Sequence, residues 1–140
     1  MMNFLQQLIV ENTAPLVVDG GLATALERNG QKLDSILWSA RLLSTAETRN
    51  AIYKVHCDFI KAGADVIITS SYQGSVAGFV KVLGVSQHEA EALLRQSTRL
   101  ACAARDDSWN QLKKTQPARI KPIVAMSVGC YGAMLHNGAE

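Results

Sequence analysis

Residues 63–73, GADVIITSSYQ, decide the fold class of this chain. Gly63 ends a helix that is predicted to run to about Ala62, because glycine favours the backbone conformation that closes a helix. The apolar run that starts at Val66 is short and continuous, which is typical of a strand buried on both faces of a parallel sheet. Polar residues follow the strand at once. The stretch therefore predicts a helix, a buried strand over Val66–Thr69 and a polar loop, which is the repeating unit of an α/β fold.

Two further stretches carry the same strand pattern. PLVVDGG, residues 15–21, predicts a strand over Leu16–Val18, and PIVAMSVG, residues 122–129, predicts one over Ile123–Val128. Each strand is short and apolar and is separated from the next by helical sequence, so the strands are predicted to be parallel and joined by right-handed crossovers. We expect the last stretch, Gly129–Glu140, to be a loop without regular structure.

The helices are predicted from apolar spacing and from start signals. Two capping boxes, Ser44 to Glu47 and Ser86 to Glu89, place a hydroxyl three residues before a carboxylate and predict helix starts. The segment 33–43 has some helical character. The predicted helices cover residues 3–11, 22–30, 44–62, 72–83 and 86–114.

The spacing of the strands predicts a barrel rather than an open sheet. An open doubly wound sheet of this length usually has about five strands, whereas here each βα unit takes roughly 50 residues, as in a (β/α)8 barrel of about 250 residues. The last strand has no predicted helix after it. We therefore expect residues 1–140 to form a single incomplete domain, the N-terminal portion of a (β/α)8 TIM-type barrel with about three βα units, truncated at its C-terminus.

Composition excludes several classes of protein. The net charge is +2 without a basic cluster, which argues against a nucleic-acid or membrane-surface partner. No apolar run approaches the roughly 18 residues of a membrane helix, and no Lys or Arg precedes Arg28, so the start does not resemble a signal peptide. The odd number of widely spaced cysteines predicts neither a disulfide framework nor a local zinc knuckle. A cytoplasmic location is the simplest expectation.

The candidate site lies where the strands end, because active sites of parallel α/β folds gather at the carboxyl ends of the strands. Those ends are residues 19–21, 69–73 and 127–132, which offer one carboxylate, several hydroxyls and exposed amides. Each also has a purely structural interpretation. Asp19 and Thr69 are suitable helix-start residues, Gly20 and Gly21 suit a tight turn, and Trp38 suits a hydrophobic plug.

The histidines and cysteines give little indication of a catalytic or metal site. His56 is expected to be a hydrogen-bonded helix histidine at the edge of the core, His88 to be exposed, and the role of His136 is left open. Cys57 and Cys102 are expected to be buried, inert thiols. Cys130 follows a strand directly and is a weak ligand candidate, since one thiolate does not make a zinc site.

Four segments in order carry a family resemblance: LVVDGGLATALERNG, ILWSARLL, VHCDFIKAGADVIITSSYQ and AMSVGCYGAML. They resemble the homocysteine S-methyltransferase family, and most closely its members that use S-methylmethionine or S-adenosylmethionine as methyl donor. The resemblance covers roughly residues 15–135. It implies a (β/α)8 barrel that transfers a methyl group to homocysteine and forms methionine.

The resemblance also implies a cofactor and a set of site residues. Zn²⁺ at the mouth of the barrel would bind the homocysteine sulfur as a thiolate, which would attack the methyl group of a sulfonium donor. Asp19 would bind homocysteine near its amino group, Thr69 would line the same pocket, and Trp38 and Tyr72 would wall it. Backbone at close approach to the substrate would come from Gly20, Gly21, Ser127 and Gly129.

Two features depart from the family pattern. Cys130 stands where the family often has proline, which fixes backbone geometry as cysteine does not. The family's zinc cysteines, in an Asn-Cys and a Gly-Gly-Cys-Cys segment, have no counterpart among residues 1–140, so we expect them to lie beyond residue 140 and these residues alone to be inactive. The alternatives are a non-catalytic product that needs a partner chain, and a different βα-barrel enzyme such as a lyase.

Overall fold

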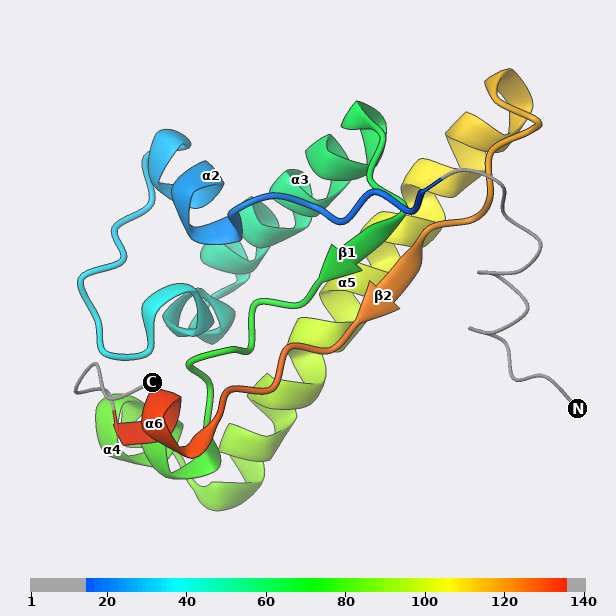
Figure 1. Ribbon diagram of the computed structural model, residues 1–140. Coiled ribbons are helices and arrows are strands. Elements are labelled where there is room, and N and C mark those ends of the chain that lie inside the picture. The colour runs from blue at the N-terminus through cyan, green and yellow to red at the C-terminus, as the bar shows by residue number, and fades with distance from the viewer. Residues whose placement is uncertain (1–14, 136–140) are drawn as a thin grey trace, which may run out of the picture.

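The computed structural model describes residues 15–135, with alternating helices and strands (Figure 1). The helix predicted over residues 3–11 and the position of His136 lie outside the described residues. The elements are α2 (Leu22–Arg28), η1 (Trp38–Ser44, a 3₁₀ helix), α3 (Ala46–Ala62), β1 (Val66–Ile68), α4 (Val76–Leu83), α5 (Gln87–Thr115), β2 (Ile123–Ala125) and α6 (Tyr131–Leu135).

The strands run parallel and lie side by side in chain order. β1 pairs with β2 from Val66↔Ile123 to Ile68↔Ala125. On the other side of β1, residues 15–18 form one parallel bridge, Val18↔Val66, so the strand predicted there is an extended segment rather than a full strand. The Val17 carbonyl oxygen still accepts hydrogen bonds from the amides of residues 65 and 66, at 2.7 and 3.1 Å.

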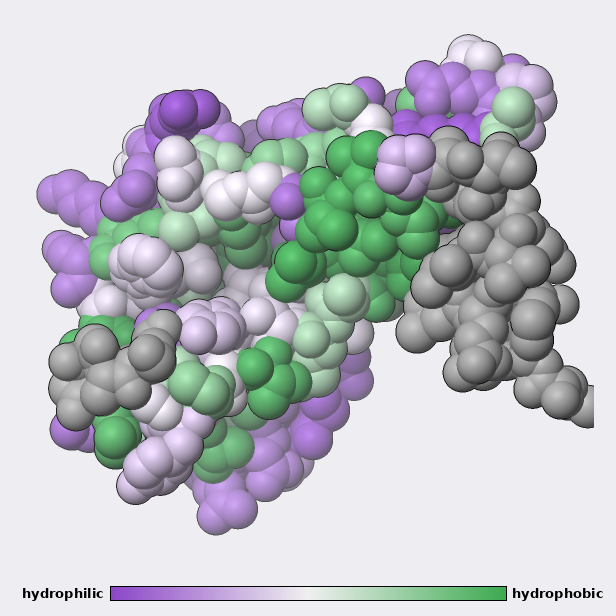
Figure 2. Space-filling view, viewed as in Figure 1, coloured by the Kyte–Doolittle hydropathy of each residue, from purple (hydrophilic) through white to green (hydrophobic). Residues whose placement is uncertain are grey.

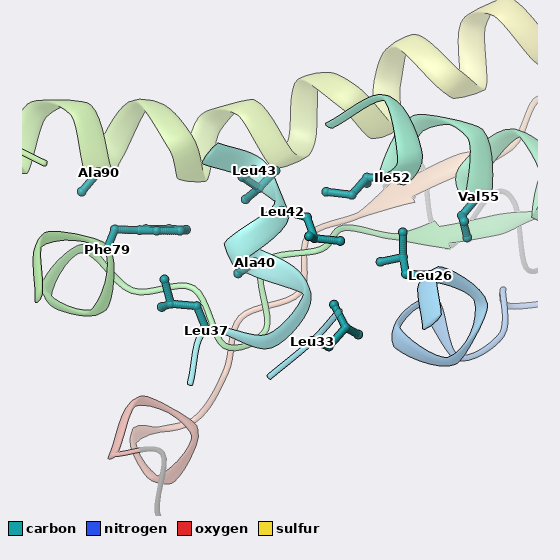
Figure 3. Close-up of a cluster of buried hydrophobic side chains, with 10 residues drawn as sticks. All are labelled: Leu26, Leu33, Leu37, Ala40, Leu42, Leu43, Ile52, Val55, Phe79 and Ala90. Atoms are coloured by element: carbon teal, nitrogen blue, oxygen red, sulfur yellow. The ribbon is translucent and has the colours of Figure 1, made fainter. Parts of the chain in front are cut away.

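The connecting helices cover one face of these strands. Figure 1 shows α3 and α5 behind the sheet, and the two helices pack on each other. Right-handed crossovers between parallel strands in chain order place every connecting helix on the same side, which explains the one-sided layer. The main core lies between α2, η1, α3, α4 and α5 (Figure 3). Its buried side chains are Leu26, Leu33, Leu37, Ala40, Leu42, Leu43, Ile52, Val55, Phe79 and Ala90.

The opposite face of the strands is apolar and exposed. Val18 is 53% exposed and Ile68 36%. Both lie on this face because Val18 pairs with Val66, whereas the intervening Ile67 is buried against α3 and α5. Figure 2 shows an apolar surface in the same view, over the strands of Figure 1. Strands of a parallel sheet carry apolar side chains on both faces because both faces are normally covered.

One capping box is confirmed and the other is wrong. The Glu89 amide donates to Ser86 Oγ at 3.2 Å, and the Ser86 amide donates to Glu89 Oε2 at 2.8 Å. At the start of α3, however, Thr45 is the cap, and its hydroxyl accepts from the Thr48 amide at 3.2 Å. Ser44 is the last residue of η1, so the first extended residue, which a cap must be, is Thr45.

Most boundaries lie within two residues of the prediction, and three features differ by more. The helix predicted from residue 72 begins only at Val76, because Ser75 is extended and its hydroxyl accepts from the Gly78 amide at 3.0 Å. β2 ends at Ala125 instead of residue 128. The predicted terminal loop contains α6, whose five residues are too few to show a helical period in sequence.

Candidate functional site

The carboxyl ends of the three parallel segments meet at one edge of the sheet. Asp19 follows the first segment, and its Oδ2 atom accepts a hydrogen bond from the Ile68 amide at 2.8 Å. Asp19 does not cap α2, because the N-cap residue there is Gly21 and no side chain caps the helix. Burial raises the pKa of the Asp19 carboxyl above its ordinary value, and the bond from Ile68 opposes that rise. A half-buried carboxylate with one bonded oxygen thus stands beside the end of β1.

Hydroxyl groups join the end of β1 to the end of β2. The last backbone bond between them runs from the Thr69 amide to the Ala125 carbonyl, at 3.0 Å. Beyond it, the Ser127 amide donates to Thr69 Oγ1 at 2.9 Å, and Ser71 Oγ donates to the Ser127 carbonyl at 2.7 Å. The hydroxyls of Thr69 and Ser71 lie 2.8 Å apart. Both residues are buried, with 3% and 2% exposed.

Ser71 lies in the predicted site segment 69–73 but was not singled out as a substrate-binding residue. The signal that could have found it is the alternation of side chains along an extended chain, since residues i and i+2 point to the same face. Thr69 and Ser71 are two residues apart, directly after an apolar strand. Two hydroxyls at that spacing are able to bond each other and the neighbouring strand.

At two of the predicted glycine positions, neighbouring protein atoms leave no room for a side chain. A Cβ atom on Gly129 would overlap the Tyr72 carbonyl oxygen and lie 2.9 Å from the Ala133 Cβ atom. A Cβ atom on Gly20 would lie 3.1 Å from the Phe59 ring. A Cβ atom on Gly21 would meet an ordinary van der Waals contact, since its nearest neighbour, Thr24 Oγ1, would be 3.4 Å away. Close packing therefore explains Gly20 and Gly129 without any ligand.

The two predicted aromatic residues, Trp38 and Tyr72, are exposed. Trp38 begins η1 with φ +48°, and among the described residues it is the non-glycine residue with a positive φ. That conformation costs free energy and persists only where the surrounding structure imposes it. It therefore sets Trp38 apart from an ordinary surface residue.

A pocket of about 280 Å³ lies beside the hydroxyl bonds, between the two polar loops and α5. Of the predicted residues it is lined by Tyr72, Ser127 and Gly129, and Cys130 also lines it. Asp19, Gly20, Gly21, Trp38 and Thr69 do not line this pocket. The sheet edge thus brings Asp19, Thr69 and Ser127 together through hydrogen bonds, whereas the pocket collects the residues of the later loops.

Residues 15–135 do not fit a zinc site, because no group of three or more His, Cys, Asp or Glu side chains there could hold a metal ion. The cysteines are free thiols: Cys57 is buried, Cys102 only half-buried and Cys130 exposed.

His56 is fully buried, and neither ring nitrogen has a hydrogen-bond partner in the described part of the chain. The expected hydrogen bond of His56 is therefore wrong, because the ring lies inside the core instead of at its edge. No helix among the described residues is long and apolar enough to cross a bilayer.

The fold and the site define an α/β chain whose polar groups gather at the carboxyl edge of parallel strands. The profile of the homocysteine S-methyltransferase family matches residues 16–140, and the chain belongs to that family. Homocysteine S-methyltransferase 1 of Zea mays is 44% identical over an alignment of 140 positions that covers 99% of this chain and 42% of the maize protein. Selenocysteine Se-methyltransferase of Brassica oleracea var. italica is 42% identical, over 97% of this chain and 40% of that protein.

A solved structure shares the fold. The metallated form of the homocysteine methyltransferase MmuM from Escherichia coli superposes with a TM-score of 0.81 at 36% identity. The match covers 95% of this chain and 44% of MmuM. This chain thus spans about two fifths of the length of the relatives that it matches.

Proposed function

We propose that the protein is a homocysteine S-methyltransferase, which transfers a methyl group from S-methylmethionine or S-adenosylmethionine to homocysteine and forms methionine. The observation that supports this most strongly is the family match across residues 16–140, which includes every strand end of the candidate site. The chain then forms one domain, the first βα units of a (β/α)8 barrel. Parallel strands in chain order and, within residues 15–135, a helix layer on one face of the sheet support the barrel, since a doubly wound sheet has helices on both faces.

In this function Asp19 binds the ammonium group of homocysteine. Its Oδ2 atom is held by the Ile68 amide, and its Oδ1 atom accepts no hydrogen bond from the described residues. Thr69 lines the same subsite, and the backbone at Gly20, Gly21, Ser127 and Gly129 approaches the substrate. The exposed faces of Trp38 and Tyr72 wall the cavity, and an aromatic face attracts the cationic sulfonium donor.

The transfer itself needs little acid–base help from this part of the chain. Homocysteine reacts as the thiolate, after its thiol proton has gone to solvent. The thiolate sulfur attacks the methyl carbon, the carbon–sulfonium bond breaks, and the donor leaves as a neutral thioether, so its sulfur needs no proton. We propose Zn²⁺ as the cofactor of the protein, with ligands beyond residue 140, because the Asn-Cys and Gly-Gly-Cys-Cys segments have no counterpart in the sequence and residues 15–135 do not fit a metal site. We further propose that the protein works in the cytoplasm and uses no nucleic-acid partner.

A methyl-transfer assay on the protein at its full natural length tests the proposal. We expect methionine from homocysteine and a sulfonium donor, and no turnover by residues 1–140 alone. Because a hydrogen bond to a charged group is worth about 1.5–3 kcal/mol, Asp19→Asn is expected to raise KM for homocysteine by about 10- to 100-fold. Asp58→Asn, at an exposed position on α3, serves as the control. Absence of turnover by the full-length protein would favour a non-catalytic role with a partner chain, and selenocysteine as the better acceptor would reassign the substrate.

A further inference from the structure

The hydrogen bonds of Ser71 fix the direction of each proton at the end of β1. A carbonyl oxygen only accepts, so the single proton of the Ser71 hydroxyl goes to the Ser127 carbonyl. The contact of 2.8 Å between the Ser71 and Thr69 hydroxyls must then use the Thr69 proton. The Ser127 amide donates to Thr69 Oγ1 in turn. The three bonds form a closed ring in which every proton is assigned.

This assignment leaves the Thr69 hydroxyl able to accept a hydrogen bond from a ligand but unable to donate one. A hydroxyl has one proton and two lone pairs. The proton of Thr69 is used by Ser71 and one lone pair by the Ser127 amide, so a single lone pair remains. Thr69 can accept from a ligand but cannot donate to it. The neighbouring Asp19 carboxylate also only accepts, and it is bonded to Ile68, the residue before Thr69.

The same ring continues the sheet by one residue. Backbone pairing between β1 and β2 stops at the bond from the Thr69 amide to the Ala125 carbonyl. Both backbone groups of Ser127, which would otherwise lack a strand partner, are bonded by the hydroxyls of Thr69 and Ser71. Ser71 thereby also sets where the loop that starts at Ser127 leaves β2.

We propose that Ser71 is a positioning residue of the substrate site: by taking the Thr69 proton and holding Ser127, it makes Thr69 an acceptor for the ammonium group of homocysteine. This inference rests on the proposed function. Without the Ser71 hydroxyl, the Thr69 hydroxyl is free to rotate, and it competes as a donor where an ammonium group needs an acceptor. Selectivity for the amino group is then reduced, although the Asp19 carboxylate is unchanged.

The test compares two ligands that differ only in the amino group, L-homocysteine and 4-sulfanylbutanoate, by calorimetric titration of the full-length protein. Ser71→Ala is expected to weaken homocysteine binding about tenfold, the loss of one hydrogen bond to a charged group. It should change binding of the amine-free ligand by less than about twofold. Equal weakening of both ligands would overturn the inference and leave a purely structural role. Unchanged binding of both would also overturn it.

Ser70→Ala is the matched control. Ser70 is as buried as Ser71, with 1% exposed, but its hydroxyl has no hydrogen-bond partner among the described residues. Ser70→Ala removes the same Oγ atom as Ser71→Ala but breaks no hydrogen bond among the described residues. Binding of both ligands should therefore stay as in the wild type. If Ser71→Ala does not fold, Ser71→Cys keeps a donor at this position, with a slightly larger atom and a weaker hydrogen bond, and should show the same selective loss, only smaller. A wild-type protein that fails to bind homocysteine would overturn the proposed function together with this inference, whereas wild-type binding without selectivity loss in the variants overturns this inference alone.

Discussion

His56 gives the sharpest prediction about stability. Its ring is fully buried in α3, next to the buried Ile52 and Ile60, and neither nitrogen has a hydrogen-bond partner in the described part of the chain. Burial lowers the pKa of His56 from 6.5 to about 4, because the charged form would lose its hydration. The folded protein therefore keeps this imidazole neutral at mildly acidic pH, whereas the unfolded chain binds a proton.

The sign and size of the effect follow from that difference. Between pH 6.5 and about pH 4 the unfolded state binds more protons, so the free energy of unfolding falls as the pH falls. Each pH unit inside this window costs about 1.36 kcal/mol. A change from about pH 7.5 to about pH 5 crosses about 1.5 units of the window and should cost about 2 kcal/mol.

The assay is urea unfolding at those two pH values, for the wild type and for His56→Leu. Leucine fills a similar volume without titrating, so the pH-dependent loss should be smaller in the variant by about 2 kcal/mol, whatever the absolute stabilities. Comparing the two proteins cancels the contribution of other groups such as Asp19. His88→Gln, at an exposed position, should keep the wild-type loss. An equal loss in His56→Leu and the wild type would refute the reasoning, because His56 would then be hydrated or bonded.

Three further substitutions test the local structure. Gly129→Ala should lower the free energy of unfolding by about 1–3 kcal/mol, because its Cβ atom would overlap the Tyr72 carbonyl, and it should also weaken homocysteine binding. Gly30→Ala meets no atom within 4 Å and should cost only the strain of φ +82°, about 1–2 kcal/mol, with homocysteine binding unchanged; urea unfolding and titration compare the two. Ser86→Ala should cost about 1 kcal/mol by removing the capping box of α5, and thermal unfolding that matches the wild type would contradict this.

Local signals predicted the elements that depend on a few neighbouring residues. Gly63 ends α3 in the left-handed conformation, with φ +117°, and Ser86 with Glu89 starts α5, as the sequence indicates. The cap of α3 was missed because Ser44 and Thr45 are both suitable caps. The choice between them depends on how far η1 extends, which is decided by its packing against α3 and α5.

The candidate site likewise has residues that the local sequence predicted and one whose role only the tertiary structure shows. The sequence placed Asp19, Thr69 and Ser127 at strand ends, and the parallel sheet brings them together through hydrogen bonds. The role of Ser71, which lies in the predicted segment 69–73, was missed because it depends on a bond to Ser127, 56 positions away along the chain.

The sequence by itself determined the alternation of helices and strands, the edge that carries the polar groups, and the family, since each depends on residue order and short-range chemistry. Only the tertiary structure decided that His56 is buried without a partner, that Gly129 is packed against the Tyr72 carbonyl, and which way the Thr69 hydroxyl points. These features depend on which distant backbone atoms come within hydrogen-bond or van der Waals distance, and no local pattern encodes that distance.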